Sequence, residues 1–220
     1  MPALEAFDIY RFFHTRESET LALRGVSMRL NAGEMVALVG PSGSGKSTLL
    51  ACLAGLDEPD GGHVELLGER LTRRSEAERA RRRAATIGIL MQSGNLFPSL
   101  CVADNVKLAM LLARKVDAER AQNLLSSVGI ADRQRARPGQ LSGGELARAG
   151  LAVALAATPP IVLADEPTGE VDAITERFIL DIMSSHCRAG AAILVATHSQ
   201  ALAAEAGRIV HLQDGRIVDG

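Results

Sequence analysis

The segment Gly40-Pro41-Ser42-Gly43-Ser44-Gly45-Lys46-Ser47 decides the fold, because it matches the pattern G-x-x-x-x-G-K-[ST] of phosphate-binding loops. The apolar run Met35–Val39 precedes it, and a helical pattern over 46–54 follows, with Gly55 placed to end the helix. Glycines let the loop backbone curl so that its N–H groups converge on phosphate oxygens, and a helix N-terminus adds partial positive charge. We therefore expect a strand, a loop and a helix that together bind the phosphates of a nucleotide.

The side chains of the loop suit the same ligand. In this pattern the lysine, Lys46, reaches the β- and γ-phosphates, and the following hydroxyl, Ser47, is a ligand of Mg²⁺. A chance Gly/Ser-rich loop is the alternative, but a strand and a helix in the required register favour phosphate binding. The predicted nucleotide-binding residues of the loop are Gly40, Pro41, Ser42, Gly43, Ser44, Gly45, Lys46, Ser47 and Thr48.

Strand and helix patterns alternate along the rest of the chain. Short apolar runs lie at 87–91, 161–164 and 193–196, with helical patterns at 102–114, 117–128, 145–157 and 171–185. This alternation predicts an α/β fold in which a parallel sheet is connected by helices. Val26, Met28 and Leu30 alternate with polar residues and predict a half-buried strand, and Asp214-Gly215 between apolar flanks predicts a hairpin.

The order of these patterns also suggests how the chain is divided. Segment 94–157 contains almost only helical patterns and lies between two predicted core strands, so we expect an inserted helical subdomain. Residues 1–93 and 158–220 would then form the α/β core. The stretch 70–83 is dense in Arg and Glu. It is either a phosphate-binding patch or a solvent-exposed helix with i,i+4 ion pairs, and its mixed signs favour the helix.

Polar residues end three of the predicted strands: Gln92, Asp165-Glu166 and Thr197-His198. Ligands of open α/β sheets bind beyond the carboxyl ends of the strands, so we expect these side chains to meet at one site with the phosphate loop. The predicted Mg²⁺ ligands are Ser47, Gln92 and Asp165. The predicted catalytic residues are Glu166 as general base, His198 and Lys46 at the γ-phosphate, and Gln92 beside Mg²⁺ or the attacking water.

The stretch Leu141-Ser142-Gly143-Gly144-Glu145 resembles the LSGGQ signature of ABC ATPases, with Glu in place of the usual Gln. The order and spacing of the other motifs agree over nearly the whole chain. The resemblance implies that 1–220 is a single ABC ATPase domain that hydrolyses ATP with Mg²⁺. It also implies a P-loop NTPase fold, with a RecA-like parallel-sheet core, an antiparallel β-subdomain and the inserted helical subdomain.

The same resemblance implies a site shared between two chains. In this family two subunits pack head to tail, so Leu141, Ser142, Gly143, Gly144 and Glu145 would bind the γ-phosphate held by the other subunit. Asp172 resembles the aspartate that crosses the dimer interface. An ordinary helix N-cap is the alternative for Asp172, and the two roles are compatible.

An aromatic ring upstream of the phosphate loop stacks on adenine in this family. Anchoring the comparison on 23–27 assigns that role to Phe13, with Phe12 and Tyr10 as alternatives. Stacking contributes binding energy without reading a base edge. The competing interpretation is that these rings only pack the β-subdomain.

Charge and hydropathy restrict the partners. The chain has 24 Lys and Arg against 26 Asp and Glu, a net charge of −2, so we expect no nucleic acid partner. The longest uncharged stretch, 150–164, is interrupted by Pro159 and Pro160 and is shorter than the roughly 20 residues of a membrane span. The first residues show no secretory signal pattern, so we expect a cytosolic chain.

The family resemblance supplies the expected partners: a transmembrane permease and a second ATPase subunit in a homodimer, on the cytoplasmic side of the cell membrane. Residues 93–110 would receive the permease's coupling helix. The motif details are similar to the lipoprotein-release, macrolide-efflux and cell-division branch. The alternatives are a non-transport ABC ATPase of DNA repair or translation, a mechanotransmitting ATPase of a cell-envelope complex, and a small-molecule kinase.

Overall fold

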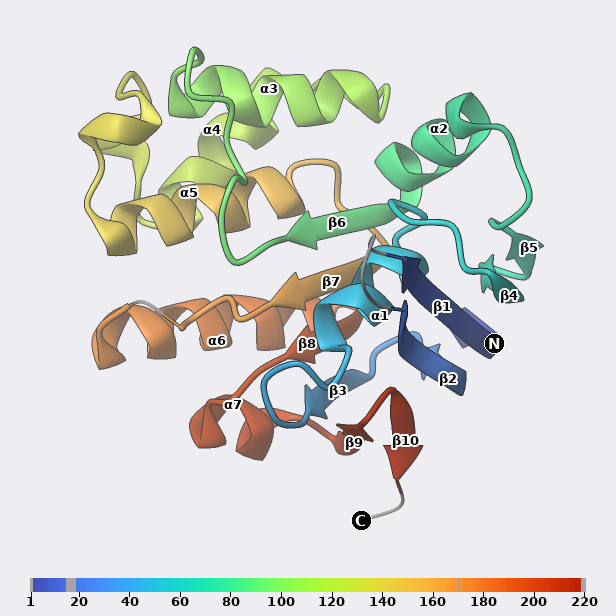
Figure 1. Cartoon of the computed structure of the whole chain (residues 1–220). Helices are drawn as coiled ribbons and strands as arrows, with labels where there is room; N and C mark the ends of the chain where they lie inside the picture. The colour runs from blue at the N-terminus through green and yellow to red at the C-terminus, as the bar shows by residue number, and fades with distance from the viewer. Residues whose placement is uncertain (1, 15–18, 170, 219–220) are drawn as a thin grey trace.

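A six-stranded sheet forms the centre of the molecule in the computed structural model, which describes residues 2–14, 19–169 and 171–218 (Figure 1). Its order is β10-β9-β3-β8-β7-β6, and every neighbouring pair is parallel except β9 and β10. The strands are β3 (Met35–Val39), β6 (Ile87–Leu90), β7 (Ile161–Asp165), β8 (Ala192–Ala196), β9 (Arg208–Gln213) and β10 (Arg216–Val218). The predicted α/β fold is confirmed. So is the hairpin, because Asp214 and Gly215 have the positive φ angles, 49° and 74°, that a two-residue turn requires.

A second sheet is antiparallel, with the order β2-β1-β4-β5. It consists of β1 (Pro2–His14), β2 (Glu19–Asn31), β4 (Gly61–Leu66) and β5 (Glu69–Arg70). Val26, Met28 and Leu30 of β2 are buried, as their alternation predicts. In β1 the register shifts between Ala6 and Ile9, so the inward positions change parity and the sequence pattern alone does not reveal the strand.

Most of the helices begin where a side chain caps them. They are α1 (Lys46–Leu53), α2 (Glu76–Thr86), α3 (Val102–Leu112), α4 (Ala118–Ser127), α5 (Gly143–Leu155), α6 (Ala173–Arg188) and α7 (Gln200–Glu205), with short turns η1 (Ala131–Arg133) and η2 (Pro138–Gln140). The predicted starts at 145 and 171 move to Gly143 and Ala173, because Ser142 and Asp172 accept hydrogen bonds from the first turns. No described helix has the length and apolar character that crossing a bilayer requires.

Helix α2 contains much of the Arg/Glu-rich stretch, and none of its residues is buried. The prediction of a solvent-exposed helix is confirmed, but the predicted i,i+4 ion pairs are wrong. Arg79 and Arg83 both contact Glu76, at 2.7 and 3.2 Å, and Arg79 also pairs with Glu58. Arg82 pairs with Glu69. The two Glu76 pairs lie within α2, at spacings of three and seven residues, whereas the pairs with Glu58 and Glu69 join α2 to the loop before β4 and to β5.

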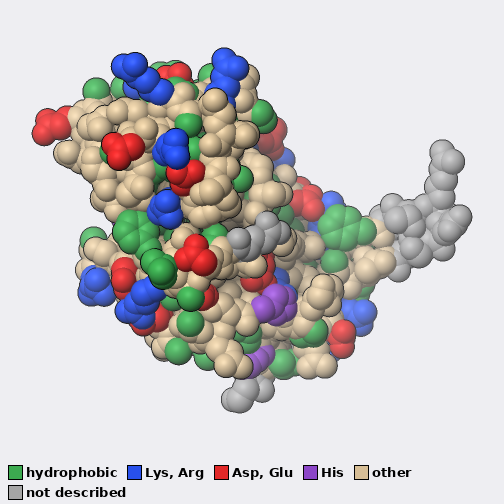
Figure 2. All heavy atoms as spheres, turned by 90° about the vertical axis from the view of Figure 1, so that its left-hand side faces the viewer, with side chains coloured by type: hydrophobic (Ala, Val, Ile, Leu, Met, Phe, Trp, Pro, Cys, Tyr) green, Lys and Arg blue, Asp and Glu red, His purple; other side chains and the backbone are tan. Residues whose placement is uncertain are grey.

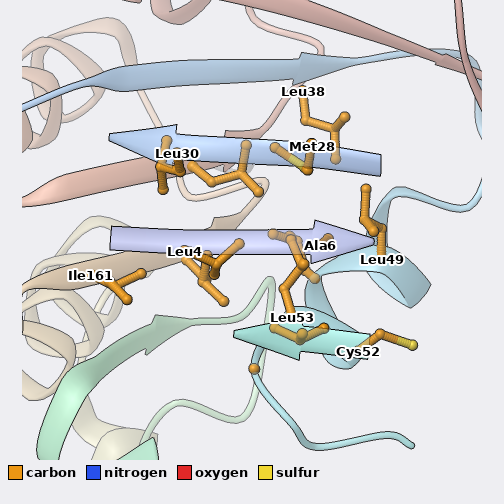
Figure 3. Packing of buried hydrophobic residues seen from close by; sticks show 14 of the residues in the cluster. Leu4, Ala6, Met28, Leu30, Leu38, Leu49, Cys52, Leu53 and Ile161 are labelled. Atoms are coloured by element: carbon orange, nitrogen blue, oxygen red, sulfur yellow. The ribbon is translucent and has the colours of Figure 1, made fainter. Parts of the chain in front are cut away.

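Two apolar clusters lie on opposite faces of the central sheet. In the first, Leu4 and Leu30 of the antiparallel sheet pack with Leu49 and Leu53 of α1 and with Ile161 of β7 (Figure 3). In the second, apolar residues of α3, α4, α5 and α6 cover the other face. Helices α3 to α5 lie between β6 and β7 in the chain and share this cluster with both strands. The subdomain boundaries at 94 and 157 stay a prediction.

Candidate active site

A cavity of about 700 Å³ lies at the carboxyl ends of the parallel strands. It brings together residues from β1, the phosphate loop, α1 and the ends of β6, β7 and β8. The sequence-predicted residues that line it are Phe13, Ser42, Gly43, Gly45, Lys46, Ser47, Thr48, Gln92, Asp165, Glu166 and His198. In Figure 1 these strands point to the left, and Figure 2 shows that face, with acidic and histidine side chains exposed near its middle.

Lys46 places a positive charge at the centre of the phosphate loop. Its side chain is buried, and its ammonium donates to the carbonyls of Gly40 at 2.8 Å and Pro41 at 3.1 Å. His198 Nε2 lies 3.4 Å from the same ammonium. Gly40, Pro41 and Ser44 do not line the cavity, and within the described residues the buried Ser44 hydroxyl has no hydrogen-bond partner. The lysine and the N-terminus of α1 together favour an anion here.

Glu166 and His198 lie side by side in the cavity wall. Glu166 Oε1 lies 3.3 Å from His198 Nε2, and Glu166 Oε2 accepts a hydrogen bond from the His198 backbone N–H at 3.2 Å. Glu166 Oε1 is buried and has no hydrogen-bond partner among the described residues. The Glu166 backbone has φ of 46°, a strained conformation that is enriched at functional sites. Glu166 Oε1, beside the His198 imidazole, is therefore the carboxylate oxygen available to accept a hydrogen bond.

The residues predicted to hold Mg²⁺ also meet in this cavity. Asp165, at the end of β7, is 5% exposed, and Asp165, Ser47 and Gln92 all line the cavity. A carboxylate, a hydroxyl and an amide oxygen are hard donors of the kind that Mg²⁺ prefers. Among the described residues, no group of three or more His, Cys, Asp or Glu could hold a metal ion. The donor set at the cavity therefore fits Mg²⁺ as a site completed by the phosphates of the nucleotide and water.

The signature segment lies outside this cavity. Ser142 caps α5: its hydroxyl accepts from the Glu145 N–H at 3.3 Å, and Glu145 accepts from the Ser142 N–H at 2.8 Å. That backbone hydrogen bond, followed by the one from Arg133, lowers the pKa of Glu145 below its ordinary value. Glu completes this capping box as well as the usual Gln does. Gly143 lines a neighbouring hollow of about 230 Å³, which also includes Gln92 and Glu166.

Asp172 caps helix α6. Its Oδ1 accepts from the backbone N–H groups of Thr175 at 2.9 Å and Ile174 at 3.0 Å, and its Oδ2 accepts from the Thr175 hydroxyl at 2.9 Å. The Thr175 backbone bond is the main reason why the pKa of Asp172 is lowered. The N-cap interpretation is therefore confirmed, and the interface role stays a prediction.

The early aromatic residues separate into different environments. Phe13 lines the nucleotide cavity and is 41% exposed. Tyr10 instead lies against Gly61 and Gly25, where its ring fills the space that side chains at these glycines would occupy. Phe7 stacks on His63 at a centroid distance of 4.6 Å. Of the three rings proposed for adenine, only Phe13 is found among the described residues that line the cavity.

Part of the cavity wall could not be predicted. Thr20, Leu21, Ala22 and Arg24 of β2, with Asp214 and Gly215 of the hairpin, also line it. The pairing of β1 with β2 skips Ala22. The Ala22 carbonyl oxygen lies so close to Gly45 and Gly215 that a Cβ added to either glycine would be only 2.7 Å or 2.5 Å from it, respectively. Asp214-Gly215 signalled a turn, but no local pattern shows that this turn would reach the phosphate loop.

A family model described as "ABC transporter" matches residues 23–169. The chain belongs to this ABC transporter family. It is 41% identical to the lipoprotein-releasing system ATP-binding protein LolD of Acinetobacter baylyi, over 98% of this chain and 97% of that protein. It is 39% identical to the macrolide export ATP-binding/permease protein MacB of Burkholderia pseudomallei, over 99% of this chain but 34% of that protein.

A solved structure gives the same result for the fold. The dimeric post-hydrolysis structure of the ATP-binding cassette MJ0796, bound to ADP and Pi, superposes with a TM-score of 0.93 and 31% identity, covering 98% of this chain and 97% of that one. The predicted ABC ATPase fold is confirmed. This chain is an ATP-binding subunit of the ABC transporter type, which hydrolyses ATP to energise transport.

Proposed function

We propose that two copies of this chain close head to tail around two ATP molecules and drive a membrane permease as they close and reopen. The observation that carries the hydrolysis part of this proposal is the meeting of Lys46, Asp165, Glu166 and His198 in one cavity. Four separate segments of the chain supply these groups, and together they match what ATP hydrolysis requires: a phosphate-binding cation, a metal ligand, a base and a hydrogen-bonding imidazole.

Within each cavity, the loop N–H groups and Lys46 bind the β- and γ-phosphates. Glu166 accepts a proton from the water that attacks the γ-phosphate, so that ATP and water become ADP and phosphate. His198 lies beside both Glu166 and Lys46, where it orients the water and the γ-phosphate. Ser47, Gln92 and Asp165 would hold Mg²⁺, which supplies charge neutralisation at the phosphates.

The signature would complete the site of the opposite subunit. Its capped N-terminus of α5 offers N–H groups and a favourable dipole for a phosphate, yet Leu141 to Glu145 do not line this chain's own nucleotide cavity. The MJ0796 cassette is dimeric in its solved structures, which supports the same arrangement here. Asp172, exposed at the start of α6, would contact the partner chain across this interface.

The permease would bind on the segment that follows Gln92. Phe97 is 60% exposed in the predicted segment 93–110, and Leu111 and Leu112, just beyond its end on α3, are each 61% exposed, which supports an apolar contact with the permease's coupling helix. The similarity to LolD and MacB supports a permease of the lipoprotein-releasing and macrolide-export type. The chain would then lie on the cytoplasmic side of the membrane, bound through its permease.

The substitution Glu166→Gln tests the hydrolytic step. Glutamine keeps the size and polarity of the side chain but cannot accept the proton, so ATP binding is retained while turnover falls by roughly 10²- to 10⁴-fold. Stalled hydrolysis should also leave an ATP-dependent dimer that is visible by size-exclusion chromatography with light scattering. Glu119→Gln, on the exposed face of α4, is the matched control. A Glu166→Gln protein that keeps most of its hydrolysis rate would exclude Glu166 as the base.

A further inference from the structure

Arg11 covers one face of the Phe13 ring. Its guanidinium carbon lies 4.8 Å from the ring centroid. The two residues are two positions apart on β1, and side chains at that spacing project from the same side of a strand. The Phe13 ring therefore has a cation on one side, while its exposed part borders the nucleotide cavity.

Two carboxylates hold Arg11 in this position. Asp57 accepts from Arg11 Nε at 2.8 Å and from Nη2 at 2.9 Å, and Asp60 accepts from Nη1 at 3.0 Å. The first of these is a bidentate pair, which fixes the plane of the guanidinium as well as its location. The hydrogen bond to Asp57, opposed in part by burial and aided by Asp60, raises the pKa of Arg11.

The carboxylates are themselves anchored. Both come from the loop between α1 and β4, and the backbone N–H of Asp60 donates to the Tyr10 carbonyl at 2.9 Å. Asp60 Oδ2 also accepts from the Phe12 backbone N–H at 2.7 Å. The loop is thereby fastened to β1 on both sides of Arg11. One cation against two carboxylates gives the cluster a formal charge of −1, so Arg11 brings no net positive charge toward the phosphates.

We propose that Arg11, held by Asp57 and Asp60, is a positioning residue that fixes the Phe13 ring so that its free face receives the purine base of the nucleotide. This inference rests on the proposed stacking role of Phe13. A cation against one face of an aromatic ring is attracted by the ring quadrupole and restricts the ring's rotation. A ring ordered before binding loses less conformational entropy when the base stacks on it. Arg11 would thus act on the base through Phe13, since Arg11 is not among the described residues that line the nucleotide cavity.

The experiment compares a nucleotide with a ligand that has no base. Binding of ADP and of pyrophosphate is measured by calorimetry for the wild-type chain, Arg11→Met, Phe13→Ala and the double variant. Arg11→Met should weaken ADP binding roughly three- to tenfold, the size expected for a cation–π contact, and leave pyrophosphate binding unchanged. In the Phe13→Ala background, Arg11→Met should have no further effect on ADP. Arg29→Met, an exposed arginine on β2, is the matched control.

Each of the other outcomes contradicts a specific part of the proposal. If Phe13→Ala leaves ADP binding unchanged, the adenine role of Phe13 fails. If Phe13→Ala weakens ADP binding but Arg11→Met does not, the positioning role fails while the proposed function stands. If Arg11→Met weakens pyrophosphate binding as much as ADP binding, or weakens ADP binding equally with and without Phe13→Ala, then Arg11 has only a structural role. Asp60→Asn removes one anchor while keeping the Arg11 charge, and it should weaken ADP binding in the same direction if Arg11→Met does not fold.

Discussion

Cys52 on α1 is fully buried in the cluster between the two sheets. Burial, together with the nearby carboxylate of Asp57, raises the pKa of its thiol to about 12. Because the thiolate is the reacting form, Cys52 should be almost inert to iodoacetamide at neutral pH. Cys101 and Cys187 are only half-buried. Peptide mass spectrometry should therefore find both labelled while Cys52 is unmodified, and Cys52 labelled only in urea. Rapid labelling of Cys52 in the folded protein would contradict this packing.

Site residues could be predicted where a local pattern has a fixed place in the fold. Glu166 and His198 each follow an apolar run, and the ends of parallel strands necessarily meet at one edge of the sheet. Arg11 and Asp57 could not be paired in this way. They are 46 positions apart, and nothing in either segment shows that the loop after α1 returns to β1. Contacts of this kind depend on how the two sheets pack.

At the scale of elements, an ion pair joins the loop before β3 to the start of β9. Arg208 Nε donates to Glu34 Oε1 at 2.7 Å, and Glu34 Oε2 accepts from the Asn31 backbone N–H at 2.8 Å. Burial raises the pKa of Glu34, but the hydrogen bonds from Arg208 and Asn31 outweigh it, and the net pKa lies below the ordinary value. A folded-state pKa below the unfolded value stabilises the protein above the unfolded pKa, and this contribution disappears as the pH falls through the folded pKa.

The free energy of unfolding, measured in urea, should therefore fall as the pH drops below about 4, and Glu34→Gln should show a smaller fall. The exposed Asp132→Asn serves as the control for removing a carboxylate. An unchanged pH profile for Glu34→Gln would show that this pair contributes nothing to the link between β3 and β9.

The N-terminal boundaries of helices α5 and α6 agree with the positions of their capping residues better than with the periodicity of their apolar residues. Helices α5 and α6 begin at Gly143 and Ala173, where Ser142 and Asp172 satisfy the first N–H groups, although apolar periodicity alone indicated 145 and 171. Strand β1 shows the opposite case. Its register shift around Asp8, which has φ of 48°, breaks the alternation that a sequence pattern depends on.

At the scale of the whole molecule, the proposed shared site rests on the separation of the phosphate loop from the signature segment. Lys46 lies in the cavity, whereas Ser142 caps a helix outside it. Ser142→Arg should therefore leave the ADP affinity of the isolated chain unchanged and abolish hydrolysis, because its bulk blocks only the site of the opposite subunit. Lys46→Ala should weaken ADP binding itself. Calorimetry and a phosphate-release assay separate the two effects, and Ser126→Arg at the exposed end of α4 controls for added bulk and charge.

The concentration dependence of hydrolysis tests the same arrangement in the unmodified chain. If each site needs two chains, ATPase activity per chain should rise with protein concentration over the range in which light scattering detects the ATP-bound dimer, because dilution separates the two halves of each site. Ser142→Arg mixed in excess with the wild-type chain should lower this activity, since a mixed dimer contains one blocked site. Constant activity per chain down to concentrations where only monomer is present would mean that one chain holds a complete site, and the head-to-tail dimer would be excluded.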